Sequence, residues 1–188
     1  MKPYREWLPA TAAGSLGGSF YSEDVTDYYM RPEELGYGKI VALDHEFIGR
    51  GALERRTGDA ARKKVTLVWN SDDVTTAIGG LFQKGKKVKY IDLPKSRYAL
   101  YHVDAVMRDG QPSGVSLDCG YITNEEAYVS LASLDAASCE PGTEVVVLWG
   151  EEPNSTKPQV EPHEQVEIRA TVAPAPYVDF ARTAYRAG

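Results

Sequence analysis

The sequence lacks long apolar segments, and this absence limits the classes of protein to which it can belong. Its longest hydrophobic runs, such as residues 145–149, are far too short to cross a bilayer. The first residues contain no apolar stretch of the kind found in secretory signals. We therefore expect a cytoplasmic protein with no membrane partner. The 43% hydrophobic and 26% charged residues are typical of a folded chain and exclude collagen-like and fully disordered classes.

Cysteine and histidine are also scarce, which argues against a disulfide scaffold and a metal site. The two cysteines, Cys119 and Cys139, are far apart and form no C-x-x-C pair. The three histidines lack the close spacing of metal-binding motifs, so only a site that the fold assembles from all three could bind a metal, and we expect none. Cys119 lies in an apolar stretch, residues 115–122, and is predicted to be a buried, reduced thiol.

Basic residues are sparse in the second half of the chain. Residues 96–188 carry 6 lysines and arginines against 14 aspartates and glutamates, which leaves no electrostatic footprint for nucleic acid. The one basic cluster comprises Lys84, Lys86, Lys87 and Lys89. We expect it to form a solvated loop and strand edge. Contact with an anionic ligand tail or partner is the alternative.

Glycine and proline, in contrast, are plentiful, with 17 and 11 residues, and they indicate many turns. Residues 1–60 show a mixed α/β pattern. From residue 61 onwards, polar and apolar residues alternate with the period of two that is typical of β-strands. We expect two units, residues 1–60 and residues 61–188, of which the second is an antiparallel barrel or sandwich. Its predicted strands are residues 64–69, 88–91, 98–107, 114–122, 128–134, 144–149 and 165–172.

Local signals predict several smaller elements. The pair Asp109-Gly110 predicts a hairpin turn. Residues 71–81 are predicted to form a short helix with Asp72 as its N-cap, and residues 49–56 are predicted to form another. Residues 39–43 are predicted to form a short strand.

No nucleophile and base can be recognised from their spacing, because the chain has no G-x-S-x-G motif. The glycine-rich residues 14–20 lack the spacing and the lysine of a phosphate-binding loop. His163 lies between acidic residues, which would raise its basicity if they fold close to it, but we expect residues 161–164 to form a surface loop. Three pairs of adjacent carboxylates are predicted to be solvent-exposed, since neighbouring strand residues point to opposite faces: Asp72-Asp73, Glu125-Glu126 and Glu151-Glu152.

A cluster of tyrosines is the most suggestive polar feature. Tyr28, Tyr29 and Tyr37 lie within ten residues of one another and close to glycines. Such phenol rings could line a pocket for a flat ring. The alternative is a core edge at which their hydroxyl groups reach water.

Residues 36–53 resemble the segment that joins the folate-binding core to the C-terminal barrel in the aminomethyltransferase family, which includes the glycine cleavage T-protein. Gly51 replaces a glutamate that is usual in the family, and His45-Glu46 are inserted after the aspartate. The features that match are a G-x-G followed by an apolar run, then Asp44, Phe47-Ile48-Gly49-Arg50 and Ala52-Leu53, with residues 22–25 and Arg31-Pro32 upstream.

Within this family, the sequence is most similar to the tetrahydrofolate-dependent aromatic O-demethylases, which act on vanillate- or syringate-like methoxyarenes. The similarity extends over essentially the whole chain. The motifs that carry it are Tyr4-Arg5-x-Trp7-Leu8-Pro9, Leu16-Gly17-Gly18-Ser19-Phe20, Asp27-Tyr28-Tyr29, Gly36-Tyr37-Gly38-Lys39, Asp44-His45-x-Phe47-Ile48-Gly49-Arg50, Arg62-Lys63-Lys64-Val65-Thr66-Leu67, Pro141-Gly142-Thr143-Glu144-Val145, Trp149-Gly150-Glu151-Glu152, Thr156-Lys157-Pro158, Val160-Glu161-Pro162-His163 and Glu167-Ile168-Arg169-Ala170.

The resemblance implies a fold, a cofactor and a reaction. The expected fold is mostly β: a short α/β segment, residues 1–60, which ends the folate-binding core, followed by the antiparallel β-barrel of residues 61–188. The expected function is that of the C-terminal portion of a one-carbon transferase that moves a methyl group from a methoxyarene to tetrahydrofolate. The alternative is a non-catalytic barrel module that docks on a separate folate-binding partner protein.

The resemblance also implies where ligands would bind. Tyr28, Tyr29, Tyr37 and Lys39 precede the barrel and are predicted to face the interdomain cavity as folate-binding residues, because tyrosine stacks on rings and lysine pairs with carboxylates. The small aromatic substrate and most of the folate are expected to be bound through the preceding part of the family enzymes. Family enzymes are considerably longer, and their preceding part holds most of the pterin pocket, so no catalytic residue is assigned. Apolar surface on residues 1–60 predicts a homo-oligomer or a partner chain.

Overall fold

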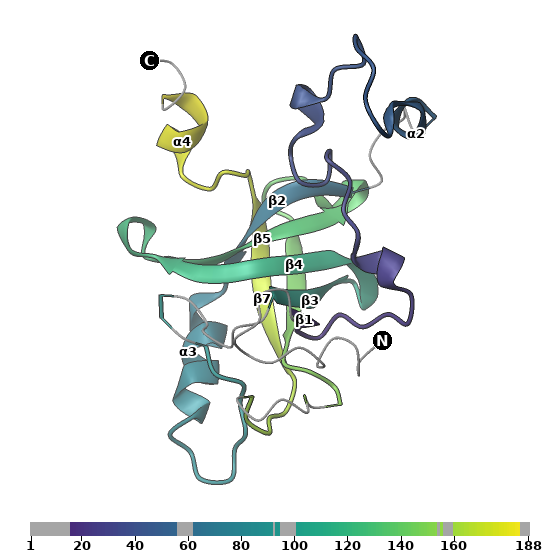
Figure 1. Cartoon of the computed structure of the whole chain (residues 1–188). Coiled ribbons are helices and arrows are strands. Elements are labelled where there is room, and N and C mark those ends of the chain that lie inside the picture. The colour runs from purple at the N-terminus through teal and green to yellow at the C-terminus, as the bar shows by residue number, and fades with distance from the viewer. Residues whose placement is uncertain are drawn as a thin grey trace.

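The computed structural model describes residues 16–55, 62–91, 93–94, 101–153, 155 and 160–184. Six antiparallel strands close into a barrel (Figure 1). The sheet runs in the order β3-β4-β5-β2-β7-β6, and a further pairing between β6 and β3 closes it. This confirms the predicted antiparallel barrel. The strands are β2 (Arg62–Trp69), β3 (Tyr101–Arg108), β4 (Gln111–Ile122), β5 (Ala127–Asp135), β6 (Glu144–Trp149) and β7 (Val166–Ala173).

The barrel core follows from the alternation of side chains along the strands. In β2, Val65, Leu67 and Trp69 point inward and are buried. The ring of Trp69 contacts that of Trp149 at 5.5 Å between centroids, and its indole N–H donates to Ser130 Oγ at 3.0 Å. Closure of the sheet leaves these strands without free edges, which is how an antiparallel barrel protects its backbone.

The hairpin between β3 and β4 forms at the predicted position. Asp109 and Gly110 have φ angles of 51° and 74°, so both central residues are left-handed, as a two-residue hairpin turn of type I′ requires. Aspartate tolerates this conformation better than most residues and glycine adopts it freely. The prediction from the Asp-Gly pair is confirmed.

The helices are short, and α3 (Ser71–Gly80) is the longest among the described residues. It begins one residue after Asn70, whose side chain accepts hydrogen bonds from the N–H groups of Asp72 and Asp73 at 3.1 Å each. The prediction that Asp72 is the N-cap is therefore wrong, because Asn70 already satisfies the first free N–H groups of the helix. The other helices are α2 (Arg50–Glu54) and α4 (Asp179–Thr183), with 3-10 turns η1 (Val25–Tyr28), η2 (Gly38–Ile40), η3 (Thr123–Glu125) and η4 (Ala136–Ser138).

Two predicted strands are absent from the described residues. Residues 39–43 contain part of η2 and no strand, since this segment lies outside the barrel, where no neighbouring strand can pair with it (Figure 1). Residues 88–91 form only one isolated bridge, between Val88 and Glu164. Residues 98–100 of another predicted strand lie outside the described residues.

Residues 16–55 cross from the barrel into an extended arm. The two-residue strand β1 (Leu16–Gly17) pairs in parallel with β3. We call residues 16–20 the strap and residues 21–55 the arm. The arm contains η1, η2 and α2 but no strand, and much of it extends away from the barrel wall (Figure 1). The predicted domain boundary near residue 60 falls outside the described residues and stays a prediction.

In the described part of the chain, no helix is long and apolar enough to span a bilayer. Nor do its histidines, cysteines and carboxylates gather into a group that could hold a metal ion.

Candidate functional site

The four residues that the sequence proposes as ligand contacts all lie on the arm. Tyr29 and Tyr37 are 64% and 56% exposed, and Lys39 is exposed as well. Tyr28 is half-buried. None of the four lines any of the three cavities described below. Their role as ligand contacts therefore stays a prediction.

Tyr28 is the best-positioned of the four. Its hydroxyl group donates to the carbonyl oxygen of Phe20 at 3.2 Å and accepts the N–H of Ser22 at 3.1 Å. Its ring meets that of Phe20 edge to face, with centroids 5.0 Å apart. The position of the Tyr28 ring is thus tied to the end of the strap.

The structure brings together a charged cluster that the sequence analysis did not identify. Glu151, Lys89 and His163 come from three separate segments, and each is at most 5% exposed. Lys89 Nζ lies 3.0 Å from Glu151 Oε1, and His163 Nε2 lies 3.0 Å from Glu151 Oε2. The backbone N–H of Gly18 donates to the same Oε1 at 2.8 Å. Oε1 of Glu151 thus accepts from Lys89 and Gly18, while Oε2 faces His163.

These positions correct three predictions. Glu151 is buried, whereas only its neighbour Glu152 is exposed as expected. His163 lies inside the protein and not on a surface loop, and Lys89 is fully buried while the other lysines of its cluster are exposed. The physical reason is that burial of a charged or polar side chain costs free energy unless it is paired. Here each of the three side chains is paired with another of the three.

The protonation state of Glu151 follows from these contacts. Burial alone would raise the pKa of its carboxyl group. The hydrogen bond with His163, the charge of Lys89 and the N–H of Gly18 outweigh burial and hold the pKa of Glu151 well below its ordinary value of 4.5. Glu151 is therefore an anion throughout the neutral pH range.

The ring of His163 is oriented by backbone groups on both sides. Its Nδ1 faces the carbonyl oxygen of Glu161 at 2.8 Å and so carries a proton. Its Nε2 lies 2.8 Å from the backbone nitrogen of Glu151, whose N–H it accepts when the ring is neutral. A second proton on the ring would instead point to Glu151 Oε2. In either state His163 holds Glu151 in place.

Aromatic rings complete the surroundings of the cluster. Lys89 Nζ lies 4.7 Å from the centroid of the Trp149 ring, and the indole N–H of Trp149 donates to the carbonyl oxygen of Lys89 at 3.1 Å. His102 stacks on Trp149 with centroids 5.5 Å apart. Lys89, Glu151 and His163 line none of the three cavities described below.

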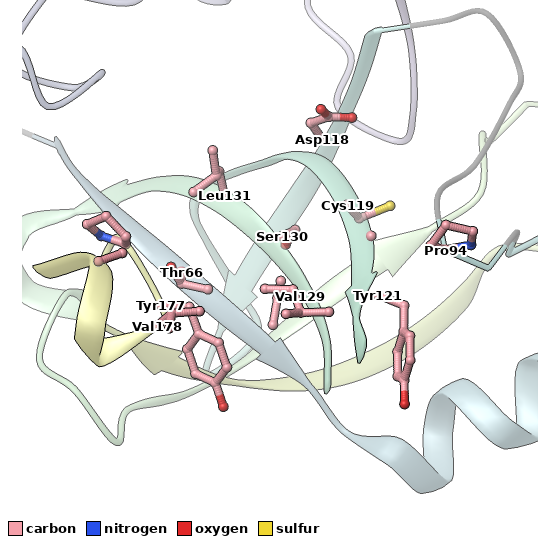
Figure 2. Close-up of a pocket in the computed structure, with 14 residues that line it drawn as sticks. Thr66, Pro94, Asp118, Cys119, Tyr121, Val129, Ser130, Leu131, Tyr177 and Val178 are labelled. Atoms are coloured by element: carbon pink, nitrogen blue, oxygen red, sulfur yellow. The ribbon is translucent and has the colours of Figure 1, made fainter. Parts of the chain in front are cut away.

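The first of the three cavities is an apolar groove of about 470 Å³ on the outer face of the barrel. It lies between strands β2, β4 and β5 and the C-terminal residues 176–181. Tyr121 and Tyr177 both line it, with their rings pointing the same way, and Cys119 lies at its wall (Figure 2). Burial raises the pKa of the Cys119 thiol to about 12. The predicted buried thiol is thus confirmed, and Cys119 offers no nucleophile at neutral pH.

The second cavity, of about 670 Å³, lies where the arm meets the barrel. Phe20, Tyr21 and Asp27 form one side, and residues of β3 and β4 form the other. Arg62 contributes a positive charge to this cavity and pairs with the buried Glu34 at 2.9 Å. The third cavity, of about 520 Å³, lies near the start of α3 and includes Arg169, which is bound to Asp73.

Similarity to characterised proteins adds what the geometry alone does not supply. No protein-family model matches the chain. The chain is 42% identical over 187 residues to syringate O-demethylase from Sphingobium sp. (strain NBRC 103272 / SYK-6), covering 97% of this chain and 40% of that protein. It is 32% identical to sesamin methylene transferase from Sinomonas sp. (strain No.22), covering 90% of this chain and 36% of that protein.

A third relative is aminomethyltransferase from Synechococcus sp. (strain RCC307). It is 30% identical over 129 residues, which cover 68% of this chain and 29% of that protein. The chain thus spans less than half the length of each of these three relatives.

Proposed function

Because the chain belongs to the aminomethyltransferase family, we propose that it is the C-terminal portion of a one-carbon transferase that moves a methyl group from a methoxyarene to tetrahydrofolate. The observation that carries this proposal is the 42% identity to syringate O-demethylase over 97% of the chain. Since the chain spans 40% of that relative, the activity belongs to a longer protein or an assembly. The proposal places this protein in the cytoplasm.

The arm is the part of the chain that we assign to ligand contact. The exposed rings of Tyr29 and Tyr37 are free to stack on a flat ring, and Lys39 can meet a carboxylate. Tyr28 is fixed against Phe20 and sits beside the second cavity, whose lining includes Asp27. The arm would thereby supply one wall of a site whose other walls come from outside the described residues.

The described residues do not fit a complete folate site. A pterin ring presents N–H groups that need a carboxylate acceptor in a cavity. Among the described residues, the buried carboxylates are Glu34, Asp104 and Glu151. Each already accepts hydrogen bonds within the protein and none lines the three cavities, whereas the carboxylates that do line them, such as Asp27 and Asp135 in the second cavity, are exposed. Recognition of the pterin therefore falls to another part of the assembly, and we derive no catalytic step through it.

A replacement experiment tests this proposal. The matching region of syringate O-demethylase is exchanged for this chain, and tetrahydrofolate binding is measured by calorimetry for the resulting chimera and for this chain alone. We expect the chimera to bind tetrahydrofolate and the isolated chain not to bind it. A chimera that folds but binds no tetrahydrofolate would contradict the proposal.

A second function is supported by the exposed apolar side chains of the arm. Ile40 and Ile48 are 74% and 105% exposed, and such side chains usually mark a contact surface when they gather on one segment. They favour a non-catalytic barrel that docks on a separate folate-binding protein. This alternative predicts a stable complex between this chain and the N-terminal region of the relative expressed as a separate protein, detected by size-exclusion chromatography.

A further inference from the structure

The strap is bound to the barrel by backbone and side-chain hydrogen bonds along its length. Ser19 donates its N–H to Asp104 Oδ1 at 3.0 Å and its hydroxyl to the carbonyl oxygen of Leu148 at 2.6 Å. The hydroxyl also accepts the N–H of Ala105 at 2.8 Å. Phe20 donates its N–H to the carbonyl oxygen of Val103 at 2.9 Å. The strap therefore continues the pairing of β1 with β3.

Gly18 lies at the closest approach between the strap and the barrel. Its φ angle is +93°, and a Cβ atom at this position would lie 2.4 Å from the carbonyl oxygen of Val103. Only glycine fits there. Its N–H group donates to Glu151 Oε1 at 2.8 Å. The strap thus meets the barrel backbone on one side and a buried carboxylate on the other.

Glu151 joins the strap to two other segments. Lys89 approaches the same oxygen, Oε1, that accepts the N–H of Gly18. His163 contacts both the backbone nitrogen and the side chain of Glu151. Lys89 and His163 orient the carboxylate of Glu151 independently of the strap. A hydrogen bond to such a charged acceptor is stronger than one to a neutral acceptor.

Phe20 connects the strap to the arm through its contacts with Tyr28. The carbonyl oxygen of Phe20 accepts the Tyr28 hydroxyl, and their rings pack edge to face. The next residues, Ser22 to Tyr28, form a compact turn in which Ser22 also contacts Asp27. A displacement of the strap would therefore move Tyr28 with it.

We propose that Glu151 is a positioning residue, whose buried carboxylate, paired with Lys89, locks the strap onto the barrel and so fixes the place of Tyr28 and the start of the arm. Glu151 does not touch a ligand in this role. It acts through Gly18, the strap and Phe20. This positioning role of Glu151, which we call the lock, does not depend on which reaction is catalysed.

The test separates the lock from the stability of the barrel. Glu151→Leu alone would leave Lys89 as an unpaired buried charge, so it is combined with Lys89→Met, which removes both charges. The matched control is Glu152→Leu, which changes the neighbouring exposed glutamate. Amide hydrogen exchange of the whole chain is followed by NMR for the wild type and for both variants.

In the double variant, we expect the amide of Gly18 to exchange about 10 to 100 times faster than in the wild type, the size expected when a hydrogen bond to a charged acceptor is lost. Buried barrel amides such as those of Leu67 and Val147 should lose far less protection than the amide of Gly18, and the control should resemble the wild type throughout. Unchanged exchange at Gly18 would overturn the proposal. Equal acceleration at every amide would overturn it as well, because Glu151 would then stabilise the barrel as a whole.

A second readout concerns the ligand and rests on the proposed function. In the chimera described above, the double variant should raise KM for the methoxyarene while the barrel stays folded. The separate single variant Lys89→Arg keeps Glu151 and the charge pair, so its KM should lie close to the wild-type value. An unchanged KM in an active chimera would show that the strap does not position the arm for the ligand. A chimera without any activity refutes the proposed function, while the exchange measurement still decides the lock.

Discussion

Lys89 Nζ and Glu151 Oε1 lie 3.0 Å apart in the interior of this protein, although both belong to residue types that sequence reasoning assigns to the surface. The pair is supported by His163 and by the ring of Trp149. Breaking a buried pair by removing one partner is costly, since the remaining charge stays in a medium of low polarity.

Removal of one partner should therefore destabilise the protein strongly. We expect Lys89→Met to lower the free energy of unfolding by about 3–5 kcal/mol. The double variant Lys89→Met/Glu151→Leu should recover a large part of this loss, because it leaves no unpaired charge. Urea denaturation followed by tryptophan fluorescence measures both values. A single variant as stable as the wild type would show that the pair is not buried as described.

The same carboxylate should make stability depend on pH in the acid range. Because the folded-state pKa of Glu151 lies below its ordinary value of 4.5, its contribution to stability is fully present above that value and is lost as the pH falls further. Between the two pKa values, one such group changes the free energy of unfolding by about 1.4 kcal/mol per pH unit. We expect Glu151→Gln to have a shallower acid limb than Glu152→Gln in denaturation curves recorded from pH 6 to pH 2. Identical acid limbs would refute the role of Glu151.

Gly18 should be far less tolerant of substitution than another glycine with the same backbone conformation. The substitution Gly18→Ala should lower the free energy of unfolding for two reasons: the φ angle is positive, and the new Cβ atom would clash with Val103. Gly142 has a φ angle of +90° but no neighbouring atom within 4 Å of its Cβ position, so Gly142→Ala measures the backbone cost alone, about 1–2 kcal/mol. Limited proteolysis should cut Gly18→Ala within the arm while the barrel of both variants survives. Equal resistance of the two variants would contradict the close approach of the strap.

The two cysteines should differ sharply in reactivity. Cys119 is buried, and its pKa of about 12 leaves almost no thiolate at neutral pH. Cys139 is partly exposed, although burial raises its pKa too. Iodoacetamide at pH 8 should label Cys139 in the folded protein and Cys119 only after unfolding, as mass spectrometry of peptides will show. Labelling of Cys119 before Cys139 would contradict the structure.

The arm should also govern association of the isolated chain. Replacement of Ile40 and Ile48 by serine removes two large exposed apolar side chains. We propose that the wild-type chain self-associates through this arm and that the variant does so less. Size-exclusion chromatography with light scattering tests this, and a wild-type chain that is monomeric at all concentrations would argue against it.

The sequence predicts the barrel better than the site because the two depend on different ranges of interaction. Alternation in β2 and the pair Asp109-Gly110 are local signals, and the strand and the hairpin follow from them directly. Residues 39–43 show the limit of such signals, since an apolar run forms a strand only when another strand lies beside it.

The buried cluster depends on contacts between residues far apart in the chain. Lys89 lies among exposed lysines, and Glu151 stands next to an exposed glutamate, so neither has a local mark of burial. The position of His163 between acidic residues is the one local signal in the sequence. It indicates that His163 has an acidic partner but does not identify that partner as Glu151. Only the fold brings the three residues together.

Methyl transfer by the chimera tests the central claim most directly. Syringate labelled with ¹³C in its methoxy groups is incubated with tetrahydrofolate and with the chimera of syringate O-demethylase that carries this chain, and the label is followed by NMR. The account predicts that the ¹³C-methyl signal moves from the arene to tetrahydrofolate, and that this chain alone moves none. A folded chimera that binds tetrahydrofolate but leaves the label on the arene would contradict it.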